Sequence, residues 1–158
     1  MNFNALVKVI DALGGIDIKM TKEEAHWCNL YGAETARVIG EHWSDIEEKA
    51  GTQHLDGIHG VAYARIRYTS RGNEHSDYGR TSRQREILVQ LMQKARSLDA
   101  TTLLAVVNNM LPLITHNIDA ATLTNLIANA PSYINYDIQT DRIPYDLSLI
   151  HISEPTRH

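Results

Sequence analysis

The sequence lacks the features that mark membrane spans, disulfide scaffolds and secretion signals. Cys28 is the one cysteine among 158 residues, so no disulfide can form within the chain. A single thiol decides nothing about whether the compartment is oxidising. No run of 18 apolar residues occurs, so nothing in these residues is expected to span a bilayer. The first residues carry neither the charged region nor the apolar core of a signal peptide.

Several catalytic signatures are also missing. The sequence contains no Gly-x-Ser-x-Gly nucleophile motif, no Walker phosphate loop and no Rossmann fingerprint. Its eight histidines show no metal-binding spacing such as His-Glu-x-x-His. The net charge of −4 argues against a general nucleic-acid binder, which presents a broad basic face. The length and the apolar content of 43% are ordinary for one globular domain, and they do not indicate a function.

One basic segment, residues 65–85, departs from this acidic background. It contains six arginines, no lysine and two acidic residues, which gives it a charge of +4 and leaves −8 for the rest of the chain. The planar guanidinium group binds oxyanions such as phosphate in a bidentate way, which lysine cannot do. The segment therefore predicts an anion site. Its arginines are Arg65, Arg67, Arg71, Arg80, Arg83 and Arg85.

The position of these arginines sharpens the prediction. Thr81 and Gln84 have capping-box spacing, which predicts a helix beginning near Thr81. Arginines at the positive end of a helix are unfavourable by a few tenths of a kcal/mol each unless an anion is bound there. Arg65 and Arg67 lie across a predicted loop at 68–79 and could face the same point. Two such clusters could bracket a pyrophosphate.

Two interpretations of this segment stay open at the level of the residues. In the second, the arginines are solvated or paired with acidic residues of the preceding stretch, as surface charges commonly are. Those partners would be Glu34, Glu41, Asp45, Glu47 and Glu48. Asp77 also has two interpretations, either orienting an arginine or holding a metal, or capping a loop as an Asx turn. Cys28 has no partner histidine at a recognisable distance and is expected to be a half-buried thiol.

The first half of the chain is predicted to contain short elements. Apolar residues at helical spacing predict a helix over 2–13, ended by two glycines, and alternation predicts a strand over 16–20. Residues 21–54 are mixed in character and are expected to form a long irregular stretch with one or two short helices. A short helix is expected over 58–65.

The second half is predicted to be helical. One helix runs to about Ser97 and a second covers 103–111; either apolar face could line a pocket, although plain core packing accounts for most positions. A third covers 120–130, with Asp119 as N-cap, Pro131 as its end and Leu123, Leu126 and Ile127 facing inward. A strand is expected over 133–140. Residues 147–158 look like a translated sequencing adapter, so we expect a native domain over 1–146 and a non-native tail.

The ordered motifs of the chain resemble the LytR-CpsA-Psr family. The family pattern has LDG, then ALxYxRxR, a variable loop and GDxxRxxRQ, with VDxLGGV before and TxNI after. Two departures leave the charged positions untouched, since Gly60-Val61 replaces a small residue plus leucine and Ser76 replaces a glycine. The matching stretches are 9–17, Leu55-Asp56-Gly57, 62–67, Asp77-Tyr78-Gly79-Arg80, Arg83-Gln84-Arg85 and 115–119.

The resemblance implies a fold and an activity. The fold would be α/β (α+β), part of a three-layer α-β-α sandwich with a mixed sheet, helix-rich in this portion. Family proteins are phosphotransferases at the extracytoplasmic face of bacterial membranes. They move a glycopolymer, such as teichoic acid or capsular polysaccharide, from a polyprenyl-pyrophosphate carrier to peptidoglycan, assisted by Mg²⁺.

The resemblance also assigns roles to residues. Arg65, Arg67 and Arg80 would contact the pyrophosphate oxygens, and Gln84 would hydrogen-bond the same head group. Asp77 would orient the arginines and Arg83 would support them within the binding site. By the same resemblance, the Mg²⁺ ligands, another arginine and the membrane anchor would belong to a preceding half, which we expect to lie outside this chain.

We therefore expect the chain to be the C-terminal half of a catalytic domain and to be inactive alone. Two alternatives to the transferase are a non-catalytic module that binds lipid-linked pyrophosphate or another polyanion, and a pyrophosphatase. A nucleic-acid role is the least expected, because the basic segment is small and its surroundings are acidic.

Overall fold

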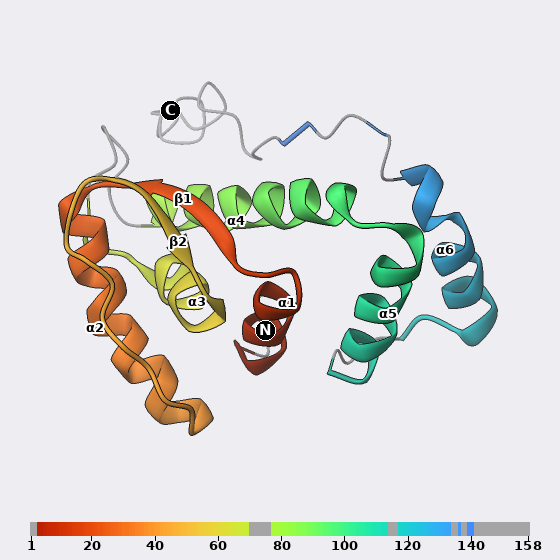
Figure 1. Ribbon diagram of the computed structural model, residues 1–158, viewed down its shortest axis with the longest axis horizontal. Coiled ribbons are helices and arrows are strands. Elements are labelled where there is room, and N and C mark those ends of the chain that lie inside the picture. The colour runs from red at the N-terminus through yellow and green to blue at the C-terminus, as the bar shows by residue number, and fades with distance from the viewer. Residues whose placement is uncertain (1–2, 70–76, 114–116, 134–135, 137–138, 141–158) are drawn as a thin grey trace, which may run out of the picture.

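The computed structural model describes residues 3–69, 77–113, 117–133, 136 and 139–140. Within them it shows a helix-rich α+β fold, as predicted (Figure 1). In chain order the elements are α1 (Phe3–Ala12), β1 (Ile16–Met20), α2 (Lys22–Ile39), β2 (Gly51–Leu55), α3 (Gly57–Arg65), α4 (Asp77–Ser97), α5 (Ala100–Met110), a 3-10 turn (Leu111–Leu113) and α6 (Ala120–Tyr133).

The two strands form an antiparallel pair with one buried face. Ile16 lies opposite Leu55, and Met20 lies opposite Gly51. Alternate residues of β1 are buried against α3 and α4, while the other face is polar and carries an ion pair between Asp17 and His54 at 2.8 Å. Of the mixed sheet that the family resemblance implies, the described part of the chain contains this antiparallel pair.

Helix α2 is the main feature that the sequence analysis missed. A capping box begins it: Glu24 N donates to Thr21 Oγ1 at 3.1 Å, and Thr21 N donates to Glu24 Oε2 at 2.9 Å. The prediction of an irregular stretch is wrong for 22–39, and β2 was not predicted. The reason is that α2 packs on α3 through small residues, which give a weak apolar signal. These buried small residues are Ala25, Cys28, Gly32 and Ala36.

The Leu-Asp-Gly motif has a structural role at the start of α3. Leu55 is fully buried at the end of β2, and the Asp56 side chain caps α3 by accepting from His59 N at 2.9 Å. Gly57 N donates to Asp11 Oδ1 at 2.7 Å. This close packing on α1 fixes the orientation of α3, and with it the position of Arg65, the last residue of α3.

Helix α4 begins at Asp77, about one turn before the predicted start near Thr81. Thr81 and Gln84 therefore lie inside the helix, and the predicted capping box is wrong. Arg80 lies in the first turn, whereas Arg83 and Arg85 lie further along. Of the three arginines that were predicted to lie at the helix start, Arg80 alone lies in the first turn. The predicted end at Ser97 is confirmed.

Helices α5 and α6 extend beyond the end of α4, away from the sheet (Figure 1). Asp119 caps α6 as predicted, accepting from Thr122 N at 2.9 Å. The helix continues past Pro131 to Tyr133, so the predicted end at Pro131 is wrong. Leu126 is 42% exposed, which contradicts its inward placement, whereas Leu123 and Ile127 are partly buried. Half of the predicted strand 133–140 (134, 135, 137 and 138) and all of the tail 147–158 lie outside the described residues, and Tyr133, its predicted first residue, belongs to α6 instead.

Candidate anion-binding site

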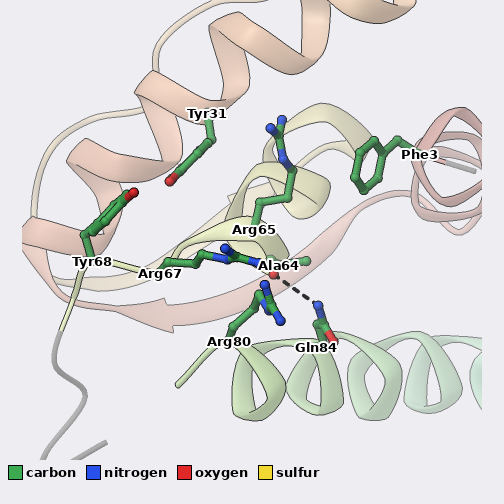
Figure 2. A pocket seen from close by; sticks show the side chains of 8 residues that line it. All are labelled: Phe3, Tyr31, Ala64, Arg65, Arg67, Tyr68, Arg80 and Gln84. Atoms are coloured by element: carbon green, nitrogen blue, oxygen red, sulfur yellow. Dashed lines mark hydrogen bonds between the residues drawn. The ribbon is translucent and has the colours of Figure 1, made fainter. Parts of the chain in front are cut away.

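A cavity of about 360 Å³ lies where the end of α3 meets the start of α4 (Figure 2). Three of the described residues that line it are arginines and none is acidic. The predicted residues Arg65, Arg67, Arg80 and Gln84 are thus brought together. The full lining is Phe3, Tyr31, Ala64, Arg65, Arg67, Tyr68, Arg80 and Gln84.

Arg65 is held in place by α2. Its guanidinium group donates to Glu34 Oε2 at 2.7 Å and to Thr35 Oγ1 at 2.9 Å. The same group lies 5.3 Å from the centre of the Phe3 ring and 5.2 Å from that of Tyr31, which are cation–π distances. The pairing with Glu34 matches the second interpretation of the sequence for this one arginine. Part of the charge of Arg65 is therefore neutralised within the protein.

Arg67 and Arg80 supply the other two cationic groups. Arg67 is exposed on the segment that follows α3, and Arg80 is partly buried in the first turn of α4. Figure 2 shows both side chains directed into the space between that segment and α4, while Arg65 turns toward Phe3. Like charges directed at one space repel each other, and an anion between them removes that cost.

Gln84 lies one turn beyond Arg80 on the same helix. Its Nε2 donates to Ala64 O at 3.5 Å, which is a long hydrogen bond and hence a weak one. The amide can therefore reorient toward a ligand at low cost. Gln84 thus lines the cavity, and its hydrogen bond to a head group stays a prediction.

Arg83 lies behind the cavity and does not line it. The residue is fully buried, and its Nε donates to Glu24 Oε1 at 3.0 Å. Its other donors reach Ile66 O at 3.2 Å and Thr69 O at 3.4 Å. A direct contact between Arg83 and a ligand does not fit this arrangement, because its guanidinium group is enclosed by protein. Its position fits a supporting role.

The remaining predicted residues are less informative. Asp77 begins α4, but its side chain and the whole of Arg71 lie outside what the structure describes. Arg85 is partly buried and is not among the lining residues. Burial raises the pKa of Cys28 to about 12, so this thiol is not a nucleophile at neutral pH. Among the described residues, no group of three histidine, cysteine or acidic side chains could hold a metal ion.

An aromatic wall beside the arginines was not predicted. The Trp27 ring lies 5.2 Å from that of Tyr68 and 6.1 Å from that of Tyr31, and Phe3 closes the other side of Arg65. Burial also raises the pKa of Tyr31. Trp27 and Tyr31 are four residues apart, which places them on one face of a helix. This signal could have been used only if α2 had been recognised.

Two apolar pockets follow the arginine cavity in turn, the first adjoining the cavity and the second sharing Leu88 with the first. The first, about 140 Å³, shares Phe3, Ala64, Arg65 and Gln84 with the cavity and ends at Leu88. The second, about 310 Å³, lies between α1, α4 and α5 and again includes Leu88. It uses apolar residues of 88–95 and 103–111, the two faces that the sequence suggested as candidate pocket walls. A cationic cavity followed by apolar pockets suits an amphipathic anion.

None of the described helices is both long enough and apolar enough to cross a bilayer.

The chain is similar in sequence and in fold to several known proteins. Biofilm regulatory protein A of Streptococcus mutans is 29% identical over 104 residues, which are 65% of this chain and 22% of that protein. The crystal structure of B. subtilis TagV superposes with a TM-score of 0.52 at 22% identity, covering 83% of this chain and 44% of that one. TagT bound to LIIa-WTA gives a TM-score of 0.51 at 21% identity, covering 82% and 42%.

At these identities the two solved structures establish the fold. The chain spans less than half the length of each of these relatives. The model of the LytR_cpsA_psr family matches residues 1–154, almost the whole sequence. The chain therefore belongs to the LytR_cpsA_psr family.

Proposed function

We propose that the arginine cavity binds the pyrophosphate of a polyprenyl-pyrophosphate-linked glycopolymer, as part of a cell-wall glycopolymer transferase. The observation that carries this proposal is that Arg65, Arg67 and Arg80 line one cavity whose described lining has no acidic residue. The adjoining apolar pockets offer a place for the lipid chain. TagT, which shares the fold, is bound to LIIa-WTA in its structure.

The proposed reaction is a phosphoryl transfer. A hydroxyl group of peptidoglycan attacks the phosphorus that carries the glycopolymer, a new P–O bond forms, and the bond to the polyprenyl phosphate breaks. Negative charge grows on the leaving phosphate during this step. Arg67 and Arg80 would stabilise that charge, and Gln84 would donate a hydrogen bond to a phosphate oxygen. Arg65 would hold the head group at the entrance to the apolar pockets.

Mg²⁺ is proposed for the complete protein. Since no described group of side chains fits a metal ion, its ligands would come from other residues. The polymer would be a teichoic acid or a capsular polysaccharide, and the acceptor would be peptidoglycan. The reaction would take place at the extracytoplasmic face of the bacterial membrane, to which an anchor outside the described residues would hold the protein.

A second candidate is a module that binds lipid-linked pyrophosphate without chemistry. The observation in its favour is that the described lining offers four strong donors for an anion but no carboxylate or histidine to act as a general base. Turnover by the complete protein would decide between the two functions.

Binding can be tested with geranyl pyrophosphate, a soluble compound that has the same head group and a short isoprenoid chain. Each of Arg67→Ala and Arg80→Ala is expected to weaken binding by about 1.5–3 kcal/mol, because each removes a charge-assisted contact. Titration calorimetry measures the affinity.

The matched control is Arg37→Ala, which removes an exposed arginine in the last turn of α2. Inorganic pyrophosphate and geraniol separate the contributions of the head group and the chain. If Arg67→Ala and Arg80→Ala both bind like the wild type, the cavity is not the pyrophosphate site.

A further inference from the structure

Two charged side chains are buried together behind the cavity. Arg83 is 0% exposed and Glu24 is 1% exposed, and their ion pair joins α4 to the first turn of α2. Both carboxylate oxygens of Glu24 have partners, since Oε2 accepts from Thr21 N and Oε1 accepts from Arg83 Nε. The positive end of α2 adds to the stabilisation of this carboxylate.

A buried pair of this kind is costly as a stabilising device. Apolar residues of similar volume usually stabilise a core as well or better, because the desolvation of two charges offsets their attraction. The pair therefore calls for a reason other than core stability. Its geometry suggests one.

The remaining donors of Arg83 hold the chain on both sides of Arg67. They reach the backbone oxygen of Ile66 on one side and both the backbone and hydroxyl oxygens of Thr69 on the other. Arg67 and Tyr68 lie between these two anchors. The direction of the exposed Arg67 side chain is thus determined by a fully buried guanidinium group.

The same residue also relates this segment to α4. Arg80 precedes Arg83 by three positions and Gln84 follows it directly, so all three move with the helix. A bond from Arg83 to the 66–69 segment therefore sets the distance between Arg67 and the cavity groups of α4. Glu24 in turn fixes the guanidinium plane of Arg83.

We infer that the Glu24–Arg83 pair is a positioning device, which holds Arg67 against Arg80 so that both meet one anion. Glu24 and Arg83 are positioning residues and do not contact the ligand. The inference rests on the proposed pyrophosphate function. It assigns the conformation of the cavity to two buried residues on α2 and α4.

The first test measures geranyl pyrophosphate binding by Glu24→Gln. Glutamine keeps the capping box but removes the charge that orients Arg83. We expect the affinity to fall at least tenfold. Glu23→Gln, which removes the neighbouring exposed charge, is expected to bind within twofold of the wild type. Equal affinities of the two variants would overturn the inference.

The second test separates positioning from stability. The double variant E24L/R83M replaces the pair with apolar side chains, and it is expected to unfold only a few degrees below the wild type, because it also loses the capping-box bond from Thr21 N to Glu24. Its affinity should stay at least tenfold below the wild type, because Ile66 and Thr69 have lost their anchor. Wild-type affinity of the folded double variant would show that the pair acts only through folding.

A third measurement needs no ligand. Trp27 contacts Tyr68, so in a Trp43→Phe background its fluorescence reports on the 66–69 segment. Glu24→Gln in this background should roughly double the acrylamide quenching constant relative to Glu23→Gln. Unchanged quenching would overturn the positioning role, while failure of the wild type to bind geranyl pyrophosphate would overturn the proposed function instead.

Discussion

At the scale of single residues, the described arginines of the 65–85 segment differ in burial and in hydrogen-bond partners, although their side chains are chemically identical. Arg83 is enclosed by protein oxygens, Arg65 is paired with Glu34, and Arg67 is exposed. The run of arginines predicted an anion site, and the family resemblance singled out four of the eight cavity residues, Arg65, Arg67, Arg80 and Gln84. The resemblance gave Arg83 a supporting role, but its full burial and the pairing of Arg65 with Glu34 could not be predicted, since both depend on which helix packs behind them.

Glu34 is expected to weaken anion binding. Its carboxylate lies 2.7 Å from Arg65 NH2, so an incoming phosphate has to compete with it. The two side chains are 54% and 24% exposed, which limits the pair to about 0.2–1 kcal/mol. Glu34→Gln should therefore raise the affinity for inorganic pyrophosphate by a factor of about 1.4 to 5, as measured by calorimetry.

The control for this prediction is Glu23→Gln, which makes the same charge change at the other end of α2. The gain from Glu34→Gln should shrink in high salt, because the exposed charges are then screened. An unchanged or weaker affinity in Glu34→Gln would show that Glu34 orients Arg65 for the ligand and does not compete with it.

At the scale of elements, the prediction succeeded where one face of a helix or strand is strongly apolar. Both α1 and β1 were found within two residues of their observed ends. Helix α2 was missed because it buries small residues, and its apolar signal comes from Trp27 and Tyr31 beside the cavity. The start of α4 was misplaced because Thr81 and Gln84 imitate a capping box inside the helix. Tertiary packing decided both cases.

The packing of α3 on α1 gives a prediction at this scale. A Cβ added at Gly57 would lie 2.3 Å from the backbone oxygen of Val7, which cannot move without shifting α1. At Gly60 the corresponding contact is 2.6 Å to the tip of the Ile10 side chain, which can rotate away. Gly57→Ala should therefore destabilise the protein by about 1–3 kcal/mol.

Gly60→Ala is the matched control, because both glycines are buried in the same nine-residue helix and both substitutions gain helix propensity. Its free energy of unfolding should fall clearly less than that of Gly57→Ala in urea titrations. Equal losses of unfolding free energy would mean that the α1 backbone moves away from an added Cβ as easily as the Ile10 side chain does. That result would contradict the close contact between the two helices.

At the scale of the whole molecule, the local and the overall charge have opposite signs. A segment of charge +4 lies in a chain of charge −4, so an anionic ligand is attracted to one place and repelled elsewhere. The apolar pockets begin at that place and run along α4 toward α5. The cationic cavity and the apolar pockets are thus arranged as the proposed head group and lipid chain would require, which the sequence alone could not predict because α1, α4 and α5 meet only in the folded protein.

This arrangement leads us to expect that the 158-residue chain binds a lipid pyrophosphate without transferring its polymer. The described cavity offers donors for the head group but no general base, and the chain spans 44% of TagV. The assay follows transfer of a labelled glycopolymer from a polyprenyl-pyrophosphate donor to peptidoglycan, with and without Mg²⁺. Binding of geranyl pyrophosphate by the same preparation serves as the control for folding, and robust Mg²⁺-dependent turnover would show that the chain contains a complete catalytic site.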